Sequence, residues 1–355
     1  MLDDEFLRRC LFDHAKKRMH DPTTLPALTH ADDCIQQLKY IILTGDWTPS
    51  APIHTTHTEP SNGKTREIDY VPYWPDGVVH WVLIESIYDQ VVPKMDPYCV
   101  AGIRGRGPHK TKRHVERWKK TDPAGMKYGA EEDIHHCFPE SDHDFIKYGY
   151  RQLIKDKYWL RLADKVVDSF DGGLPIGYVT SHWFQNLAMT AFDRYVRSLD
   201  GVDHYYRYVD NIHMYGRNKR KLHRALMASM DWLCAAGYCC NASWQVYRTD
   251  YIDKDGKRHG RAVDGLGFVI YTDHTIFRKR TSKRLIRLCL DIKKRPHGKP
   301  TQHQAQQAAC RIGQLKHADM HNFRVKHVDG VVSYKIIKGV IKGDNGTNQR
   351  KKGAV

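Results

Sequence analysis

The sequence lacks several features that would place it in a specialised class of protein. No stretch approaches the ~20 apolar residues that cross a bilayer, and the acidic start, Met1 to Glu5, has no basic segment followed by an apolar run. The nine cysteines are odd in number and scattered along 355 residues, which argues against a disulfide framework. No internal repeat is visible. We therefore expect a soluble, unexported protein in a reducing compartment, with no membrane partner.

Acidic residues are also fewer than basic ones. The chain has 41 Asp and Glu against 57 Lys and Arg, which gives a formal net charge of +16 and a pI near 9.3. Such a surplus favours a polyanionic partner, either nucleic acid or an anionic membrane surface. Hydrophobic residues at 41% and charged residues at 28% are ordinary for a globular protein, so wholesale disorder, collagen and a coiled coil are excluded.

Cysteine pairs with the spacing of a zinc site are absent as well. The best zinc candidate is a looser group in the C-terminal part, made of Cys310, His317, His321 and His327. Structural zinc sites usually have closer cysteine pairs, so we interpret this group as a polar, basic helix face.

Hydrophobic periodicity predicts a mixture of helices and strands. Helices are expected over residues 77–92, 180–198 and 219–236, and again from residue 281. Strands are expected over residues 126–138, 204–216 and 266–271. Because the two kinds of element do not alternate regularly, the pattern favours an α+β sheet with helices on one face. The last residues, 346–355, are expected to be disordered.

Two aspartates stand out because each lies beside apolar, strand-forming residues. They are Asp133, which precedes Ile134, and Asp210, which follows Tyr208 and Val209. A buried carboxylate without a partner is costly, and a bound divalent cation offsets that cost. Two Mg²⁺ ions ~3.5–4 Å apart can hold the attacking and leaving oxygens of a phosphoryl transfer. Taken alone, either aspartate fits a helix cap or an ion pair better.

A glycine-rich turn that leads into a helix, residues 173–186, lies between the two aspartates. Gly173 and Gly177 would let the backbone approach a nucleotide closely. The simpler interpretation is a plain turn, with Thr180 or Ser181 as the N-cap of the helix.

In this order the motifs resemble those of reverse transcriptases, the RNA-directed DNA polymerases. Residues 133–138 resemble the first motif of the family's palm domain, which opens with a metal-binding Asp. Residues 173–186 resemble the turn and helix that contact nucleotide and template. Residues 208–211 stand in the place of the family's Tyr-x-Asp-Asp hairpin.

Two further segments extend the resemblance to about residues 60–280. Upstream, residues 64–68 resemble the strand whose basic residues hold the incoming triphosphate. Downstream, residues 264–268 together with Arg278 resemble the primer-grip hairpin.

The resemblance implies a role for each matching residue. The catalytic residues would be Asp133, Asp210 and Asn211, and Mg²⁺ (two ions, or Mn²⁺) would be held by Asp133, Asp210 and Ile134. The nucleotide and primer contacts would come from Lys64, Arg66, Phe138, Ile176, Gly177 and Tyr208. Among these, Lys64 and Arg66 would bind phosphates. Phe138 would select deoxyribose, and Tyr208 would lie against the primer terminus.

Within the family, residues 174–177, Leu-Pro-Ile-Gly, followed by Ser181, resemble the diversity-generating retroelement group most. That group copies a template RNA loosely, mostly opposite adenines, and works with a small basic accessory protein in a bacterial or phage-infected cell. This sequence departs from its pattern at His182, where Gln is usual, and at Asn211, where the second Asp is usual. The alternatives are a weakened or inactive nucleic-acid-binding relative, and a reverse transcriptase of retrons or phage defence.

The implied architecture is a right-hand polymerase. It has an N-terminal region, 1–60, fingers at 61–132 with 144–172 inserted, a palm of antiparallel sheet backed by helices at 133–143 and 173–280, and a short helical thumb at 281–345. Its implied partners are template RNA, a primer or cDNA end, and dNTPs. The basic stretches 104–120 and 278–299 would contact duplex phosphates, or be solvated charged faces.

Overall fold

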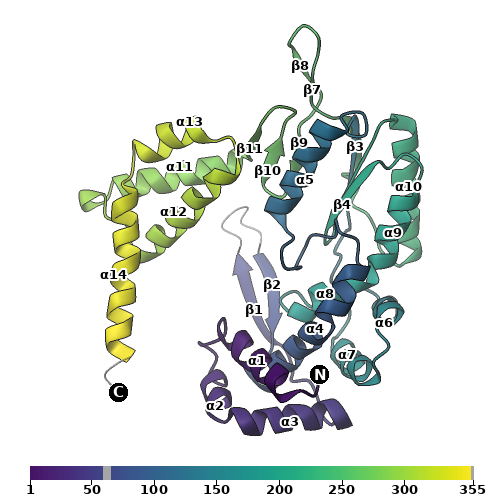
Figure 1. Ribbon diagram of the computed structural model, residues 1–355, viewed down its shortest axis with the longest axis vertical. Helices are drawn as coiled ribbons and strands as arrows, with labels where there is room; N and C mark the ends of the chain where they lie inside the picture. Colours follow the sequence, from purple (N-terminus) through teal and green to yellow (C-terminus); the bar gives the residue numbers. More distant parts are fainter. Residues whose placement is uncertain (59–64, 353–355) are drawn as a thin grey trace. The chain divides into compact units, whose positions relative to one another are not determined.

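The computed structural model describes residues 1–58 and 65–352 (Figure 1). The chain divides into two compact units, the first made of Met1–Gly107 and Ala124–Val246, the second of Pro108–Pro123 and Tyr247–Val355. Both contain helices and antiparallel strands, so the predicted α+β class is confirmed. Within the described ranges, no helix is both long and apolar enough to cross a membrane.

A helical core forms one part of the first unit. Its helices are α1 (Asp4–Ala15), α2 (Thr24–Thr29), α3 (Ala31–Thr44), α4 (Val78–Val91), α6 (His143–Leu153), α7 (Lys157–Asp168) and α8 (Val179–Ala188), with short helices at Tyr73–Gly77 and Val92–Lys94. Their apolar faces meet around buried residues such as Leu83, Trp159 and Phe184. The Trp159 indole donates to the Leu83 carbonyl at 2.8 Å, which satisfies its buried N–H.

The same unit carries an exposed hairpin made of β1 (Ile53–Thr58) and β2 (Thr65–Tyr70). The strands are antiparallel, with Ile53 opposite Tyr70. The predicted phosphate ligand Lys64 falls in the segment that joins them, 59–64, and lies outside the described residues.

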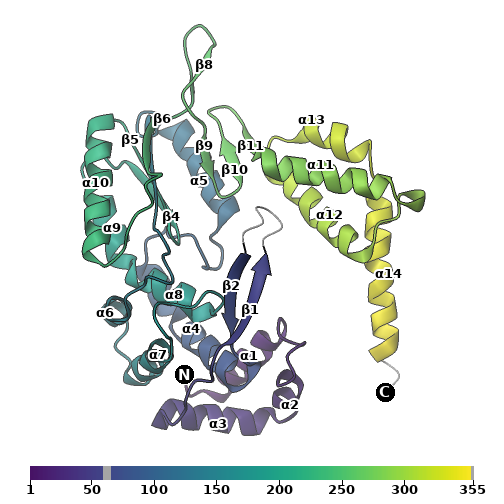
Figure 2. The same ribbon diagram turned by 180° about the vertical axis from the view of Figure 1, so that it is seen from behind.

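A four-stranded sheet, in the order β4-β5-β3-β6, forms the other part. Its strands are β3 (Tyr128–Asp133), β4 (His204–Tyr208), β5 (Asn211–Gly216) and β6 (Gln245–Arg248). Helices α9 (Thr190–Ser198) and α10 (Lys219–Ala235) cover one face, as Figure 2 shows. Ala130, Ile212 and Met214 point into that covered face. The prediction of a sheet with helices on one face is therefore confirmed for this sheet.

The predicted helix 180–198 is in fact two helices, α8 and α9, which break at Met189. The periodicity continues through the break, but the apolar residues are buried in different places. Phe184 and Leu187 belong to the helical core, whereas Phe192 and Val196 pack against the sheet. The chain bends because one helix cannot serve both cores.

The second unit contains α5 (Pro108–Thr121), a three-stranded sheet and the C-terminal helices. The sheet has the order β11-β10-β9, from β9 (Val263–Gly265), β10 (Phe268–Ile270) and β11 (Thr275–Phe277). A separate small hairpin pairs β7 (Tyr251–Ile252) with β8 (Arg258–His259). The helices are α11 (Lys279–Lys293), α12 (Gln302–Gln314), α13 (His321–Arg324) and α14 (Tyr334–Lys352), with short helices at Pro296–Gly298, Leu315–His317 and Val325–Asp329.

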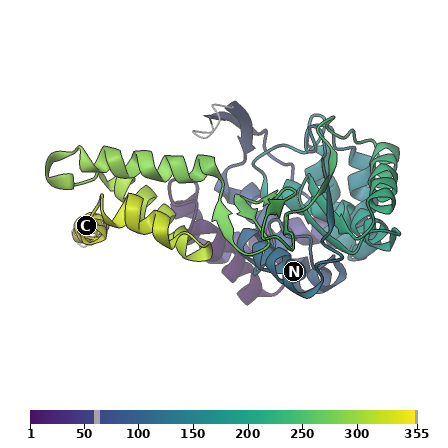
Figure 3. The same ribbon diagram turned by 90° about the horizontal axis from the view of Figure 1, so that it is seen from above.

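Helix α12 packs against both α11 and α14 (Figure 3). Helix α14 continues through 346–352, the first seven of the residues expected to be disordered, and 353–355 lie outside the described residues.

Candidate functional site

The two predicted aspartates meet at one end of the four-stranded sheet. Asp133 is the last residue of β3, and its register partner on β5 is Asn211. The main-chain N–H of Ile134 donates to the Asp210 carbonyl at 3.1 Å. The buried Ile134 side chain is apolar, so only its carbonyl could ligate a cation. Two residues 77 positions apart in sequence (210 − 133) are thus neighbours at the strand ends.

Asp133 is held by a residue that no sequence pattern singles out. The Asn241 amide donates to Asp133 Oδ2 at 2.6 Å, and the Asn241 main-chain N–H donates to the Asp133 carbonyl at 2.8 Å. The two residues are 108 positions apart, and no local pattern connects them. These bonds fix the direction of a half-buried carboxylate.

Asp210 lies in a two-residue turn between β4 and β5, whose closing pair is Tyr208 and Asn211. Val209, the first residue of that turn, has φ 57°, a conformation that strongly disfavours a β-branched side chain. The exposed Asn211 amide donates to Asp210 Oδ1 at 2.7 Å. Asn211 is therefore a hydrogen-bond partner of the Asp210 carboxylate.

A buried guanidinium holds this strained turn. All five N–H donors of Arg207 are used, on Asp193, Asn186, the Val209 carbonyl and the Cys99 sulfur. Both Arg207 and Asp193 are 0% exposed. Burial alone would lower the pKa of Arg207, but the charge of Asp193 raises it well above its ordinary value, so the guanidinium stays protonated. Sequence reasoning missed this pair.

Phe138 packs against His182, whose imidazole is close enough to Asp210 to feel its charge. Their ring centroids are 5.6 Å apart. Burial lowers the pKa of His182, although the nearby Asp210 charge opposes this and Arg207 adds to it. His182, which the sequence marked only as a departure from a family pattern, therefore lies near the aspartate in an environment that favours its neutral form.

The turn 173–178 is fixed from both sides by backbone contacts. A Cβ on Gly173 would lie 2.3 Å from the Phe138 carbonyl oxygen, and one on Gly177 would lie 2.2 Å from the Asp69 carbonyl oxygen. The Asp69 N–H also donates to the Ile176 carbonyl at 2.8 Å. Gly177 has φ 122°, which favours glycine. The close approach expected there is thus made to strand β2.

This contact places β2 beside the turn. Arg66 and Ile68 share one face of the strand by alternation, and Glu67 and Asp69 share the other. The second face lines a cavity of about 430 Å³ with Asp171. Three carboxylates make that cavity unsuited to a triphosphate, whereas the exposed Arg66 lies on the opposite face.

The basic residues of 104–120 are of two kinds, those that make structural contacts and those that are exposed. Arg104 stacks 4.5 Å from Tyr88 and pairs with Glu85, and Arg106 donates to three main-chain carbonyls, so both are structural. Helix α5 instead presents a basic stripe, defined by the exposed residues Lys110, Arg113, Arg117 and Lys120. Their spacing puts all four cations on one helix face.

Helix α11 has a similar exposed stripe, made of Arg280, Lys283 and Arg287, which the C-cap residue Lys294 extends. Its first turn holds cations and no acidic residue, although the helix dipole disfavours positive charge there. The positive charge at this end of the helix is therefore not offset by an acidic residue of the first turn.

Residues 264–268, which resemble a primer-grip hairpin in sequence, do form a hairpin. Leu266 and Gly267 turn between β9 and β10 with φ 54° and 88°. Arg278 pairs with Asp264 and donates its main-chain N–H to the Gly267 carbonyl at 3.1 Å.

The zinc candidate is not assembled. Among the residues that the structure describes, the set of three metal-ligating side chains close enough to share an ion is His135, His136 and Glu140. No protein-family model matches the chain, and no curated protein matches it.

Proposed function

We propose that the protein is an RNA-directed DNA polymerase that adds dNTPs to a primer 3′-hydroxyl. The observation that carries the proposal is the pair of aspartates from separate motifs, Asp133 at the end of β3 and Asp210 in the strained β4–β5 turn, joined through the Ile134 N–H. A phosphoryl-transfer site needs two carboxylates on rigid elements at one place.

The donor set fits Mg²⁺ or Mn²⁺. Both carboxylates are only half buried, and both are oriented by amides, from Asn241 and Asn211. Mg²⁺ binds through one or two carboxylates and keeps its remaining positions for water and substrate phosphates. When bound, such ions lower the pKa of the primer hydroxyl and neutralise charge on the transferring phosphate.

The other residues bind and orient the substrates. Phe138, held against His182, would pack on the deoxyribose and exclude a ribose 2′-hydroxyl. Arg66 would bind the triphosphate in a bidentate fork. Tyr208, one residue before the turn, would lie against the primer terminus.

In this proposal the right-hand polymerase fold accounts for both units. The palm, 133–143 and 173–280, includes the four-stranded sheet of the first unit and the primer-grip hairpin of the second. The stripes on α5 and α11 would hold template RNA and cDNA by their phosphates, with a strong dependence on salt. Loose copying in a diversity-generating retroelement, with a small basic accessory protein, follows from the Leu174–Gly177 resemblance.

Primer extension on an RNA template, with Mg²⁺ and then Mn²⁺, tests the proposal. The unaltered protein should incorporate dNTPs, while Asp133→Ala and Asp210→Ala should fall to the level of a blank without protein. Phe138→Ala should admit ribonucleotides. Incorporation that persists in either aspartate variant would refute the two-carboxylate site.

A second candidate function is nucleic-acid binding without catalysis, and Asn211 favours it. An amide in place of a carboxylate removes one negative charge beside Asp210, which weakens cation binding. Asn211→Asp should lower the Mg²⁺ concentration needed for incorporation. Salt-sensitive RNA binding with no incorporation under either metal, by the unaltered protein and by Asn211→Asp, would favour the binding protein.

A further inference from the structure

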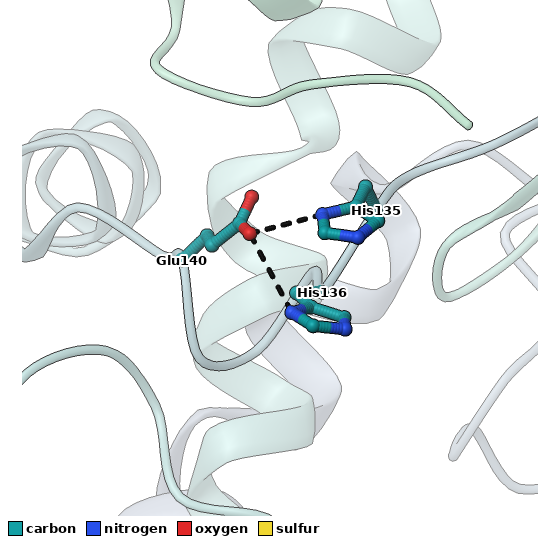
Figure 4. Close-up of side chains that lie close together, drawn as sticks. All are labelled: His135, His136 and Glu140. Atoms are coloured by element: carbon teal, nitrogen blue, oxygen red, sulfur yellow. Dashed lines mark hydrogen bonds and ion pairs between the residues drawn. The ribbon is translucent and has the colours of Figure 1, made fainter. Parts of the chain in front are cut away.

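Two histidines and a glutamate converge just after Asp133, in a cluster that the proposed polymerase chemistry does not use. His135 Nδ1 lies 3.0 Å from Glu140 Oε1, and His136 Nδ1 lies 3.6 Å from the same oxygen (Figure 4). All three ligand atoms lie within 4.8 Å of one another. We propose that His135, His136 and Glu140 form a binding site for a divalent transition-metal ion of the Zn²⁺ class.

The backbone brings the two imidazoles to one side. Adjacent residues of a strand point to opposite faces, but β3 ends at Asp133 and His136 has φ 39°. The two rings consequently stack, with centroids 3.9 Å apart and planes 20° apart. A left-handed conformation is uncommon outside glycine and costs energy, so it marks a position worth explaining by function.

Hydrogen bonds hold the main chain of the cluster on both sides. The His135 N–H donates to the Cys239 carbonyl at 2.8 Å, and the Glu140 N–H donates to the His136 carbonyl at 2.9 Å. The Ser141 hydroxyl closes the same turn by donating to the Cys137 carbonyl at 2.6 Å. The three ligand side chains therefore start from a fixed backbone, which reduces the entropy that metal binding must overcome.

The distances match a tetrahedral site. Zinc bonds to imidazole nitrogen and carboxylate oxygen are about 2.0–2.2 Å long, so neighbouring ligand atoms lie roughly 3.3–3.5 Å apart in a tetrahedron. The separations of 3.0 and 3.6 Å lie on either side of that range. An ion would need only small side-chain movements to replace the His135–Glu140 hydrogen bond and the longer His136–Glu140 contact.

The ligand types select the metal. Two imidazoles and one carboxylate suit Zn²⁺, Co²⁺ or Ni²⁺, whereas Mg²⁺ and Ca²⁺ prefer oxygen ligands throughout. The side chains of His135, His136 and Glu140 are 45%, 62% and 36% exposed, which leaves a coordination position open to water or an anion. The site is therefore distinct in chemistry from the carboxylate pair of Asp133 and Asp210, although it begins two residues away.

Metal titration of the full chain tests the inference, with Co²⁺ as the spectroscopic probe and Zn²⁺ as competitor. Glu140→Gln keeps the size of the side chain, and His135→Ala with His136→Ala removes both nitrogens from a surface turn. Losing a ligand should cost more than the tenfold to 100-fold of an outer-shell partner, so we expect affinity to fall by at least about 100-fold. Circular dichroism of each variant checks that the fold is kept.

Two controls separate this site from other sources of binding. His321→Ala tests the C-terminal zinc candidate and should bind Co²⁺ with unchanged affinity. Excess Mg²⁺ should not displace the probe. Unchanged affinity in Glu140→Gln and in the double histidine variant, or loss of binding in His321→Ala, would overturn the inference. Because binding is read directly, a failure of polymerase activity leaves this test unaffected.

Discussion

Replacing Asp193 with asparagine keeps the size of the side chain but leaves the buried Arg207 guanidinium without its counter-ion. Two of the five Arg207 hydrogen bonds, at 2.7 and 2.8 Å, end on that carboxylate. Both residues are fully buried, so solvent cannot replace the lost charge. Breaking a buried ion pair by removing one partner costs about 3–5 kcal/mol. For a unit of this size the midpoint of thermal unfolding should fall by roughly 6–20 °C.

A double variant separates the loss of charge balance from the loss of the support that Arg207 gives to the β4–β5 turn. Asp193→Leu with Arg207→Met removes both charges, and apolar replacement of a buried pair is often neutral or stabilising. The Tyr205 hydroxyl, which donates to Asp193 Oδ1 at 2.6 Å, then loses its acceptor at about 1–3 kcal/mol. Stability should therefore recover to within about 3 kcal/mol of the unaltered protein. The Val209 carbonyl still lacks its Arg207 donor, so the turn that presents Asp210 stays unsupported.

Urea unfolding, followed by tryptophan fluorescence, gives the stability of the three proteins, and primer extension gives their activity. We expect Asp193→Asn to lose both, and the double variant to regain stability without activity. A loss under about 1 kcal/mol in Asp193→Asn would refute the buried ion pair. Full activity in the double variant would show that Arg207 does not position the turn.

Three further predictions concern other parts of the molecule. Gly177→Ala should destabilise the protein by about 1–3 kcal/mol in thermal unfolding, because a Cβ would lie 2.2 Å from the Asp69 carbonyl oxygen at φ 122°. Burial raises the pKa of Glu132 from 4.5 to about 7, against hydrogen bonds that lower it. The extra native-state proton affinity contributes its full stabilisation below pH 4.5, and up to about 3 kcal/mol of stability should be lost as the pH rises from 4.5 through 7. Arg113→Gln with Arg117→Gln should reduce the slope of log K against log salt for RNA by about 1.4–1.8.

Each of these has a matched control. Gly172 has φ 92° but open space around it, so Gly172→Ala should lower the free energy of unfolding less than Gly177→Ala. An equal loss of stability would show that the contact with β2 is unimportant. Glu132→Gln should flatten the pH dependence while Glu131→Gln, on the other face of the strand, should not. Arg113→Lys keeps the charge, and a changed salt slope in that variant would contradict a purely electrostatic contact.

The local sequence was enough to predict most of the helices and strands and to identify the two aspartates as candidate site residues. Helices such as α4 and α10 follow from apolar residues at helical spacing. Strand-forming residues over 204–216 predict extended chain there, which the structure divides into β4 and β5 at the turn of Val209 and Asp210. These patterns act within a few residues of the chain. They are therefore visible before any packing is known, and so is the excess of positive charge.

Tertiary structure alone decided what surrounds those carboxylates. Asn241 reaches Asp133 across 108 positions, and Asp193 meets Arg207 only because the helix predicted over 180–198 breaks at Met189 to serve two cores. That strand β2 lies against Gly177 is likewise visible only in the packed structure. Such contacts depend on which elements share a core. The periodicity of a segment cannot show which elements share a core, because burial is a property of the packed chain and not of the segment.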